Sequence, residues 1–327
     1  MNIIISGGGG FLGKNLIEYL VDNKEEGVKL EIIVLDNFIS SNLYDFNKFK
    51  ENIKDTKISL LEFDICQYEM MSCIKKEYNK IDYIYHLSSL ASPVMYKKHP
   101  MKTLDCGYIG TKNMLELAKF YNTRILFAST SEVYGDALET PQKESYYGNV
   151  NPFGERSCYD SSKRVSEALC YTYINEYNVN VKIARIFNSF GKYMLIGDGR
   201  IITEIIRCLI NDEELNIYGD GEQTRSLCYA RDTVYMLSEL IKSSTNFPVN
   251  IGNDVELSIN EITRLVHKVY KNNFNKSSKL RIKYVKLTQN DPLMRKPCLN
   301  LNKQVLRNFE YTDIEESIIN TINYFLQ

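Results

Sequence analysis

The first 36 residues constrain the fold of this chain more than any other stretch. A short apolar run over residues 3–5 predicts a strand, and a glycine-rich turn over residues 6–13 follows it directly. Leucine and isoleucine then recur at helical intervals over residues 12–20. A strand, a glycine turn and a helix in this order are typical of the first unit of a parallel α/β sheet.

The spacing of the glycines indicates what kind of ligand this turn can bind. Gly7, Gly10 and Gly13 stand three residues apart. Glycines at such positions permit a tight turn, close approach of a pyrophosphate to the backbone, and close packing of helix on strand. The next expected strand, residues 31–35, ends in Asp36, where a carboxylate accepts hydrogen bonds from ribose hydroxyls and repels a 2′-phosphate. The pattern therefore predicts NAD, rather than NADP, as the cofactor.

Strands and helices continue to alternate after this unit, which predicts a doubly wound parallel sheet. Further strands are expected over residues 58–63, 81–87, 124–128 and 181–187, with long helices over about 100–121 and 157–176. Beyond residue 187 the alternation loosens, and a smaller α/β lobe interwoven with the first is expected.

The loss of strand–helix alternation beyond residue 187 suggests where the chain divides into two domains. We expect a cofactor-binding domain over residues 1–187 and a substrate-binding lobe over residues 188–327. Segments near 226–253 are expected to pack back onto the first domain.

Tyr159 and Lys163 form the first candidate catalytic pair. They stand four residues apart at the start of an expected helix, so their side chains share one face. A phenol titrates near ~10 in water, too high for a base at neutral pH. We expect the nearby ammonium group to lower the pKa of Tyr159 and to make it a proton acceptor. An ordinary amphipathic helix also carries such pairs, so the interpretation depends on the rest of the chain.

A hydroxyl-rich segment, residues 129–135, follows the fifth expected strand. Chemistry in doubly wound sheets occurs at the carboxyl ends of strands, so Thr130 can hydrogen-bond the hydroxyl that Tyr159 deprotonates. Glu132 is the sole carboxylate in the segment, and a solvated loop acid is its alternative interpretation. Asp64 either meets an adenine amino group or ends a strand in a turn, and His86 is expected to be a packing residue.

Composition excludes several other classes of protein. Forty basic and 41 acidic side chains leave a net charge of −1, and no basic stripe predicts a nucleic-acid partner. Eight cysteines without a CxxC pair and three dispersed histidines predict no metal site and free thiols. With no leader pattern and no apolar run of membrane-spanning length, we expect a cytoplasmic protein without a membrane partner.

Together these elements resemble the extended short-chain dehydrogenase/reductase family, which carries GxxGxxG, an acid after the second strand, and YxxxK. Within it the chain is most similar to the UDP-glucuronate decarboxylases, above all in the Glu-Arg-Ser-Cys-Tyr-Asp run of residues 155–160. The other matching segments are 91–93 with Tyr96, 130–136, 141–144, 151–152, 161–164, 184–188, 198–200, 218–221, 223–225 and 295–297. Departures are Ser161-Ser162 before Lys163, the run after Asn188, and Cys298 where an Asp is common.

The resemblance implies a set of site residues. The implied cofactor-binding residues are Gly7, Gly10, Phe11, Leu12, Gly13, Asp36, Asn37, Asp64, Ile65, Leu87, Tyr159 and Lys163. The implied catalytic residues are Thr130, Ser131, Glu132, Tyr159, Lys163 and Arg295. The implied substrate-binding residues are Ser92, Pro93, Tyr96, Asn188, Arg200, Tyr218, Gln223, Arg225 and Arg295. For the arginines at 200 and 225, which suit phosphate recognition, surface ion pairs are the alternative.

The resemblance also implies a reaction and an assembly. UDP-glucuronate would be oxidised at C4, lose CO₂ and be reduced again to UDP-xylose, with tightly bound NAD recycled. Glu132 would assist at C5 or position a water, and Arg295 would stabilise an oxyanion at C4 or orient the uronate. The two long helices would pair with those of a second subunit in a four-helix bundle, giving a homodimer.

Three alternatives remain open at this stage. A nucleotide-sugar 4,6-dehydratase needs a carboxylic acid where this chain has Ser131, and a serine hydroxyl is too weak an acid for that role. A 4-epimerase would leave the carboxylate of the sugar in place. A scaffold that binds NAD without catalysis has no need of Thr130, Tyr159 and Lys163 together.

Overall fold

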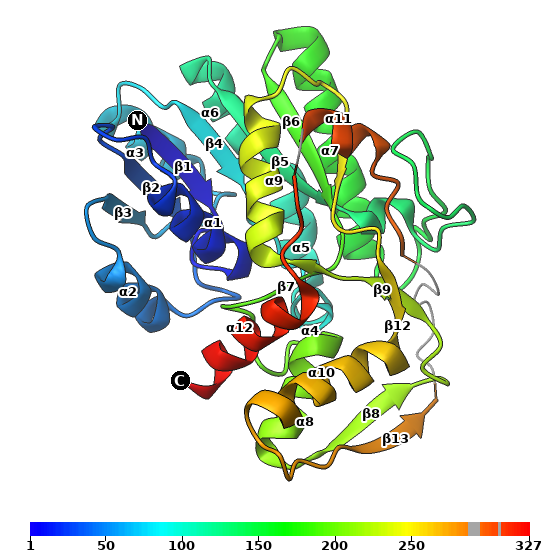
Figure 1. The fold of residues 1–327 in the computed structure, drawn as a ribbon. Coiled ribbons are helices and arrows are strands. Elements are labelled where there is room, and N and C mark those ends of the chain that lie inside the picture. Colours follow the sequence, from blue (N-terminus) through cyan, green and yellow to red (C-terminus); the bar gives the residue numbers. More distant parts are fainter. Residues whose placement is uncertain (287–294, 307–308) are drawn as a thin grey trace.

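The computed structural model describes residues 1–286, 295–306 and 309–327. A seven-stranded parallel sheet with helices on both faces forms the larger part of the molecule, and a smaller α/β lobe lies below it in Figure 1. The prediction of a doubly wound parallel sheet with a smaller lobe is confirmed.

The order of the strands reverses near the middle of the sheet. In spatial order the strands are β11 (Val249–Ile251), β6 (Val181–Ile186), β5 (Arg124–Thr130), β4 (Tyr83–His86), β1 (Asn2–Ser6), β2 (Glu31–Leu35) and β3 (Lys57–Leu61). The chain runs from β1 outward to β3 and then crosses to β4 on the other side of β1. Ligands of open α/β sheets bind where the strand order reverses in this way.

The first strand explains why helices cover both faces. Ile3 and Ile5 belong to one buried cluster, whereas Ile4 belongs to another. Successive side chains of a strand point to opposite faces, so a run of three isoleucines requires cover on each side. The helices that cover the sheet are α1 (Phe11–Asp22), α2 (Leu43–Asn52), α3 (Tyr68–Glu77), α6 (Thr111–Tyr121), α7 (Ser157–Tyr177) and α9 (Ala230–Lys242).

The helix expected over residues 100–121 is confirmed, and the structure adds an irregularity that the sequence did not predict. It consists of α5 (Pro100–Asp105), a π-helical turn η1 (Cys106–Gly110) and α6, and a separate helix α4 (Pro93–Lys98) precedes it. A Cβ atom on Gly107 would lie 2.5 Å from that of Ser162 on α7. The π turn therefore accompanies a very close approach of two helices, which periodicity alone does not indicate.

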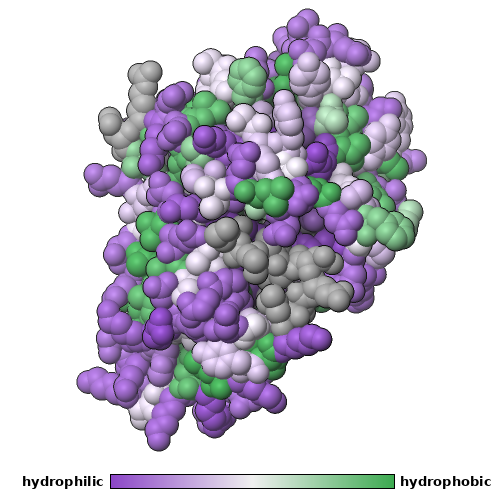
Figure 2. Space-filling model, turned by 90° about the vertical axis from the view of Figure 1, so that its right-hand side faces the viewer, coloured by the Kyte–Doolittle hydropathy of each residue, from purple (hydrophilic) through white to green (hydrophobic). Residues whose placement is uncertain are grey.

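The smaller lobe has its own apolar cluster, which includes Ile205, Ile217 and Val266. Its elements are β7 (Ser189–Phe190), α8 (Ile201–Asn211), β8 (Glu214–Tyr218), β9 (Thr224–Ser226), β10 (Cys228–Tyr229), β12 (Glu256–Ser258), α10 (Ile259–Asn273), β13 (Arg281–Val285) and α12 (Ile314–Leu326). The short helix α11 (Asn300–Val305) packs instead against β11 of the large sheet. On the face shown in Figure 2, hydrophilic residues predominate and apolar residues form small separated groups. Within the described ranges, no helix has the length and apolarity to cross a membrane.

His86 is a buried structural residue at the end of β4. Its Nδ1 lies 2.8 Å from the Ser6 hydroxyl and its Nε2 lies 3.1 Å from the Thr111 hydroxyl. Burial lowers the pKa of His86 to about 3, so the neutral ring joins β1 to α6 by hydrogen bonds.

Candidate active site

Two adjoining cavities open at the carboxyl ends of the central strands. The first, of about 230 Å³, lies against the glycine turn, and the second, of about 360 Å³, lies between the sheet and the smaller lobe. Phe11, Leu12, Leu87 and Arg200 line both cavities. Two ligands bound in these cavities would therefore contact each other.

The glycine turn in the first cavity has the geometry that a pyrophosphate needs. Gly7 has a positive φ of 74°, a conformation that favours glycine. A Cβ atom on Gly13 would lie 2.3 Å from the carbonyl oxygen of Gly7. Gly10 caps α1 without a side-chain hydrogen bond, so backbone N–H groups of the first turn remain available to an anion.

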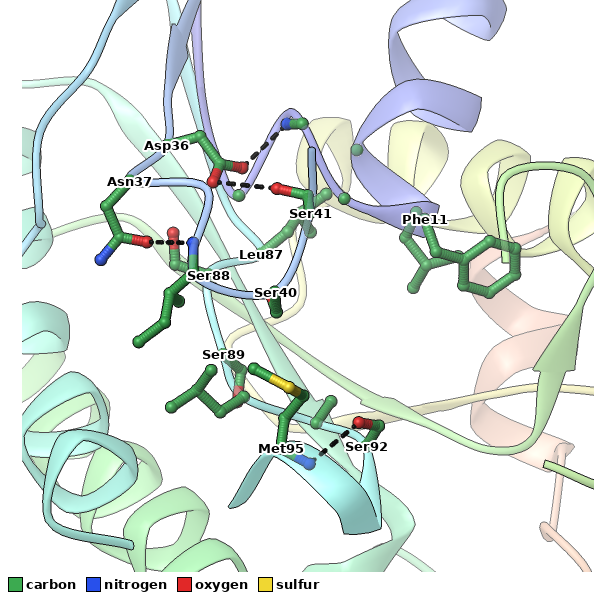
Figure 3. Close-up of a pocket in the computed structure, with 18 of the residues that line it drawn as sticks. Phe11, Asp36, Asn37, Ser40, Ser41, Leu87, Ser88, Ser89, Ser92 and Met95 are labelled. Carbon is green, nitrogen blue, oxygen red and sulfur yellow. Dashed lines mark hydrogen bonds between the residues drawn. The ribbon is translucent and has the colours of Figure 1, made fainter. Parts of the chain in front are cut away.

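Asp36 stands at the end of β2 beside this turn. Its carboxylate accepts hydrogen bonds from the backbone N–H groups of Gly9 (2.9 Å) and Phe38 (2.8 Å), and from the Ser41 hydroxyl (3.3 Å). Burial raises the pKa of Asp36. Figure 3 shows Asp36 and Ser41 near the glycine turn and Ser92 with Met95 at another part of the wall. A buried acid next to a glycine cradle fits the adenosine half of NAD.

The predicted cofactor-binding residues gather around this cavity. Those that line it are Gly7, Gly10, Phe11, Leu12, Gly13, Asp36, Asn37, Asp64, Ile65 and Leu87. Ser92, which the resemblance places with the substrate, lines the first cavity, directly before Pro93, which lines the second. Its hydroxyl accepts a hydrogen bond from the backbone N–H of Met95 (3.3 Å) and so caps α4.

Tyr159 and Lys163 lie on the first two turns of α7 and both line the second cavity. Burial raises the pKa of Tyr159, and a side-chain hydrogen bond with Thr130 opposes this effect only in part. The Lys163 ammonium group donates a hydrogen bond to the Ala128 carbonyl (2.7 Å) and lies 6.0 Å from the centre of the Tyr159 ring. The expected lowering of the phenol pKa is therefore wrong for this structure, because desolvation outweighs the distant cation.

Lys163 itself is perturbed by the same environment. Its side chain is buried, and burial lowers its pKa to about 8. Strongly perturbed pKa values of this kind cluster at functional sites.

Thr130 and Ser131 reach the second cavity because β5 extends two residues further than expected. The Thr130 hydroxyl accepts a hydrogen bond from the backbone N–H of Glu132 (3.3 Å) and starts the 3₁₀ turn η2 (Ser131–Tyr134). This turn places Ser131 and Glu132 side by side in the cavity wall.

Glu132 is held between two arginines. Arg295 Nη1 lies 2.8 Å from Glu132 Oε1, and Arg295 Nη2 lies 3.0 Å from Oε2. Arg156 Nη2 also hydrogen-bonds Oε2. All three side chains are largely buried and line the second cavity. Charge-assisted pairs of this kind fix a carboxylate in one orientation.

Arg156 and its neighbour Asp160 received no role from the sequence. Arg156 precedes Tyr159 by three residues, so helical spacing alone places both side chains on one side of the start of α7. Asp160 Oδ2 lies 3.8 Å from Arg156 Nε. Burial, followed by the charge of Glu132, raises the pKa of Asp160 to about 7.

The remaining predicted substrate residues line the second cavity: Pro93, Tyr96, Asn188, Arg200, Tyr218, Gln223, Arg225 and Arg295. The Tyr96 ring stacks on that of Tyr159 with centroids 5.2 Å apart. Among the described residues, the Tyr96 hydroxyl and the Asn188 Nδ2 atom are buried without a hydrogen-bond partner. Buried polar groups require partners, and a ligand rich in hydroxyl and phosphate oxygens would supply them.

The fold, the glycine turn and the two adjoining cavities define a dinucleotide-dependent enzyme. A family model described as GDP-mannose 4,6 dehydratase matches residues 4–311. The chain therefore belongs to the extended short-chain dehydrogenase/reductase family of epimerases and dehydratases.

Individual relatives carry more specific names. UDP-glucuronic acid decarboxylase 3 of Arabidopsis thaliana is 42% identical over 306 residues, which cover 94% of this chain and 83% of that protein. UDP-glucuronic acid decarboxylase 1 of Xenopus tropicalis is 40% identical and covers 99% of this chain and 72% of its own length. A UDP-glucuronic acid 4-epimerase from Bacillus cereus, solved with UDP-glucuronic acid and NAD, has a TM-score of 0.84 at 20% identity, covering 100% of this chain and 99% of its own. That structural likeness supports the fold.

Proposed function

We propose that this protein is an NAD-dependent UDP-glucuronate decarboxylase that forms UDP-xylose through a 4-keto intermediate. The observation that carries the proposal is the wall of the second cavity. It combines Ser131, two buried arginines and Glu132 beside the Tyr159 phenol. The likeness to decarboxylases over most of the chain supports the same reaction.

The first cavity fits NAD because of its glycine cradle and its buried Asp36. NAD bound there would supply the hydride acceptor and donor for C4 of the sugar. The positive charge of oxidised NAD would oppose the effect of burial on the phenol, so that Tyr159 would accept the proton of the C4 hydroxyl, and Thr130 would orient that hydroxyl. Lys163 would hold the nicotinamide ribose. It would also gain or lose a proton as the Tyr159 phenol titrates.

Loss of CO₂ follows from the chemistry of the oxidised sugar. A ketone at C4 lies β to the C6 carboxylate, so the electron pair of the C5–C6 bond delocalises into the ketone as CO₂ leaves. C5 then takes a proton before C4 is reduced again. Arg156 and Arg295 would orient the uronate carboxylate, and Glu132 would position the water that protonates C5.

A 4,6-dehydratase fits this cavity less well. Elimination of water from C6 requires an acid beside the leaving hydroxyl, and Ser131 occupies the corresponding place in the turn after β5. A serine hydroxyl does not provide an acidic proton at neutral pH. A 4-epimerase would use the same Tyr159 but would retain all six sugar carbons.

The proposal predicts one distinctive product. Purified protein incubated with UDP-glucuronate and NAD should release CO₂ and form a nucleotide-linked pentose, measured by headspace analysis and mass spectrometry. UDP-glucose is the matched control, because it lacks the carboxylate and should give no product. Formation of a 6-deoxy-4-keto sugar from UDP-glucose, with no CO₂ from the uronate, would overturn the assignment.

We also propose a homodimer that pairs α5–α6 and α7 with those of a second subunit. Support comes from Met101, Leu104 and Tyr108, which are exposed apolar residues at i, i+3 and i+7 spacing beside α7. A stripe of this kind suits a helix-bundle interface. Light scattering should give twice the monomer mass, and Leu104→Asp should shift it to monomer; a monomeric native protein would contradict this proposal.

Residues 1–187 and 188–327 are proposed as the cofactor and sugar-nucleotide lobes. Their interweaving is supported by α9, which packs on α1, and by β11, which pairs with β6 at the edge of the large sheet. The second cavity then lies between two parts of the chain that both contribute strands to the large sheet.

A further inference from the structure

An acidic group beside the wall of the second cavity has no part in the reaction described above. Asp160 follows Tyr159 on α7 and is 7% exposed. It does not line the cavity, and its Oδ1 atom is buried without a hydrogen-bond partner among the described residues. A buried carboxylate with an unsatisfied oxygen is costly, so its charge is sensitive to nearby groups.

Charged and titratable groups approach Asp160 from several elements. Glu132 comes from η2, Arg156 from the residue before α7, and Arg295 from the C-terminal part of the chain. Tyr96 on α4 faces the same carboxyl group, as do Cys158 and Tyr159 on α7 itself. Arg156 connects the two carboxyl groups, because it hydrogen-bonds Glu132 and lies 3.8 Å from Asp160.

The net charge of this cluster determines which ligands can bind beside it. The two arginines and ionised Glu132 leave one net positive charge among these described groups, which suits a ligand with a single carboxylate. If Asp160 is also ionised, the cluster is neutral, and a uronate carboxylate would add an unbalanced negative charge in a buried place.

We propose that Asp160 is a positioning residue that couples binding of the uronate carboxylate to uptake of one proton. This inference rests on the proposed function, because it concerns how the same cavity accepts UDP-glucuronate. Protonated Asp160 would leave Arg156 and Arg295 able to hold the uronate while they still hold Glu132. By linkage, a bound uronate raises the affinity of Asp160 for its proton to the same extent.

The raised pKa of Asp160, about 7, sets the pH range. Below it the carboxyl group is neutral and uronate binding is strongest. As the pH rises through this value, Asp160 loses its proton and uronate binding weakens. For one proton, KM for UDP-glucuronate should rise about tenfold between about pH 6 and about pH 8.

Substitution of Asp160 tests the coupling. Asp160→Asn is neutral at every pH, so its KM should stay near the low-pH value of the wild type throughout that range. Glu155→Gln is the matched control: it removes a neighbouring carboxylate that is 76% exposed and paired with Lys97, and it should keep the wild-type rise in KM. Binding of UDP-glucose, measured by competition, should depend little on pH in all three proteins. An unchanged rise in KM in Asp160→Asn would overturn the inference.

A second measurement keeps Asp160 in place, in case its replacement impairs folding. UDP-glucuronate binding to NAD-loaded Tyr159→Phe, which should not turn over, is measured by calorimetry at about pH 7.5 in buffers of different ionisation enthalpy. Uptake of about half a proton or more per site is expected, and none with UDP-glucose. Absence of uptake would refute the coupling. Release of CO₂ by the wild type at about pH 6 tests the proposed function separately.

Discussion

Tyr159→Phe should reduce kcat by about 10²–10⁴-fold, because the C4 hydroxyl loses its proton acceptor. The Tyr159 phenol is buried beside Thr130, in the wall of the second cavity. Loss of one oxygen leaves the ring able to stack on Tyr96, so folding and NAD content should stay close to those of the wild type. Steady-state release of CO₂ from UDP-glucuronate, together with the absorbance of bound cofactor, measures both effects.

The matched control for this substitution lies on the same helix. Tyr173 is also buried on α7, and its hydroxyl donates to Glu116 (2.5 Å) and not to any group in the cavity. Tyr173→Phe should lose about 1 kcal/mol of stability and keep its activity. Full turnover by Tyr159→Phe would remove the catalytic role of the phenol.

Gly13→Ala should abolish tight cofactor binding and destabilise the fold. The added Cβ atom would lie 2.3 Å from the Gly7 carbonyl oxygen and 2.6 Å from the Gly8 Cα atom. Both are backbone atoms, so α1 must move away from β1. Overpacking of this kind costs about 1–3 kcal/mol, and loss of two charge-assisted hydrogen bonds to a pyrophosphate would weaken NAD binding by about 100-fold or more.

Thermal unfolding and equilibrium titration with NAD measure these two effects separately. Gly27→Asn is the control, because Gly27 has nothing within 4 Å of its Cβ position and a φ of 79°, which Asn tolerates. This control should bind NAD as the wild type does. Wild-type NAD affinity in Gly13→Ala would mean that the turn does not hold the pyrophosphate.

Local sequence patterns predicted the sheet and the cofactor cavity well. The isoleucines of β1, the glycines of the turn and Asp36 act within 36 residues, so their spacing carries the information. The ion pair between Arg295 and Glu132 is different, because the two residues are 163 positions apart in the sequence. Local spacing therefore carries no information about their contact, which depends on the fold of the smaller lobe. Periodicity also gave no sign of the π turn before α6, which accompanies contact with α7.

The pKa of Tyr159 shows why chemistry is harder to predict than position. Sequence spacing placed Lys163 on the correct helix face, but it contained no measure of desolvation. In the folded chain the Lys163 ammonium group donates to Ala128, and burial dominates the titration of the phenol.

The six-residue helix α4 and its cap contribute residues to both cavities, so the helix links the ligand preferences of one cavity to those of the other. Its cap, Ser92, lines the first cavity, while Tyr96, four residues later, lines the second cavity and stacks on Tyr159. Both residues belong to one short helix and its cap, so a substitution that displaces α4 displaces both. Redesigning the enzyme for a new cofactor through this helix would therefore alter its sugar selectivity as well, and mutations would have to be chosen for both ligands at once.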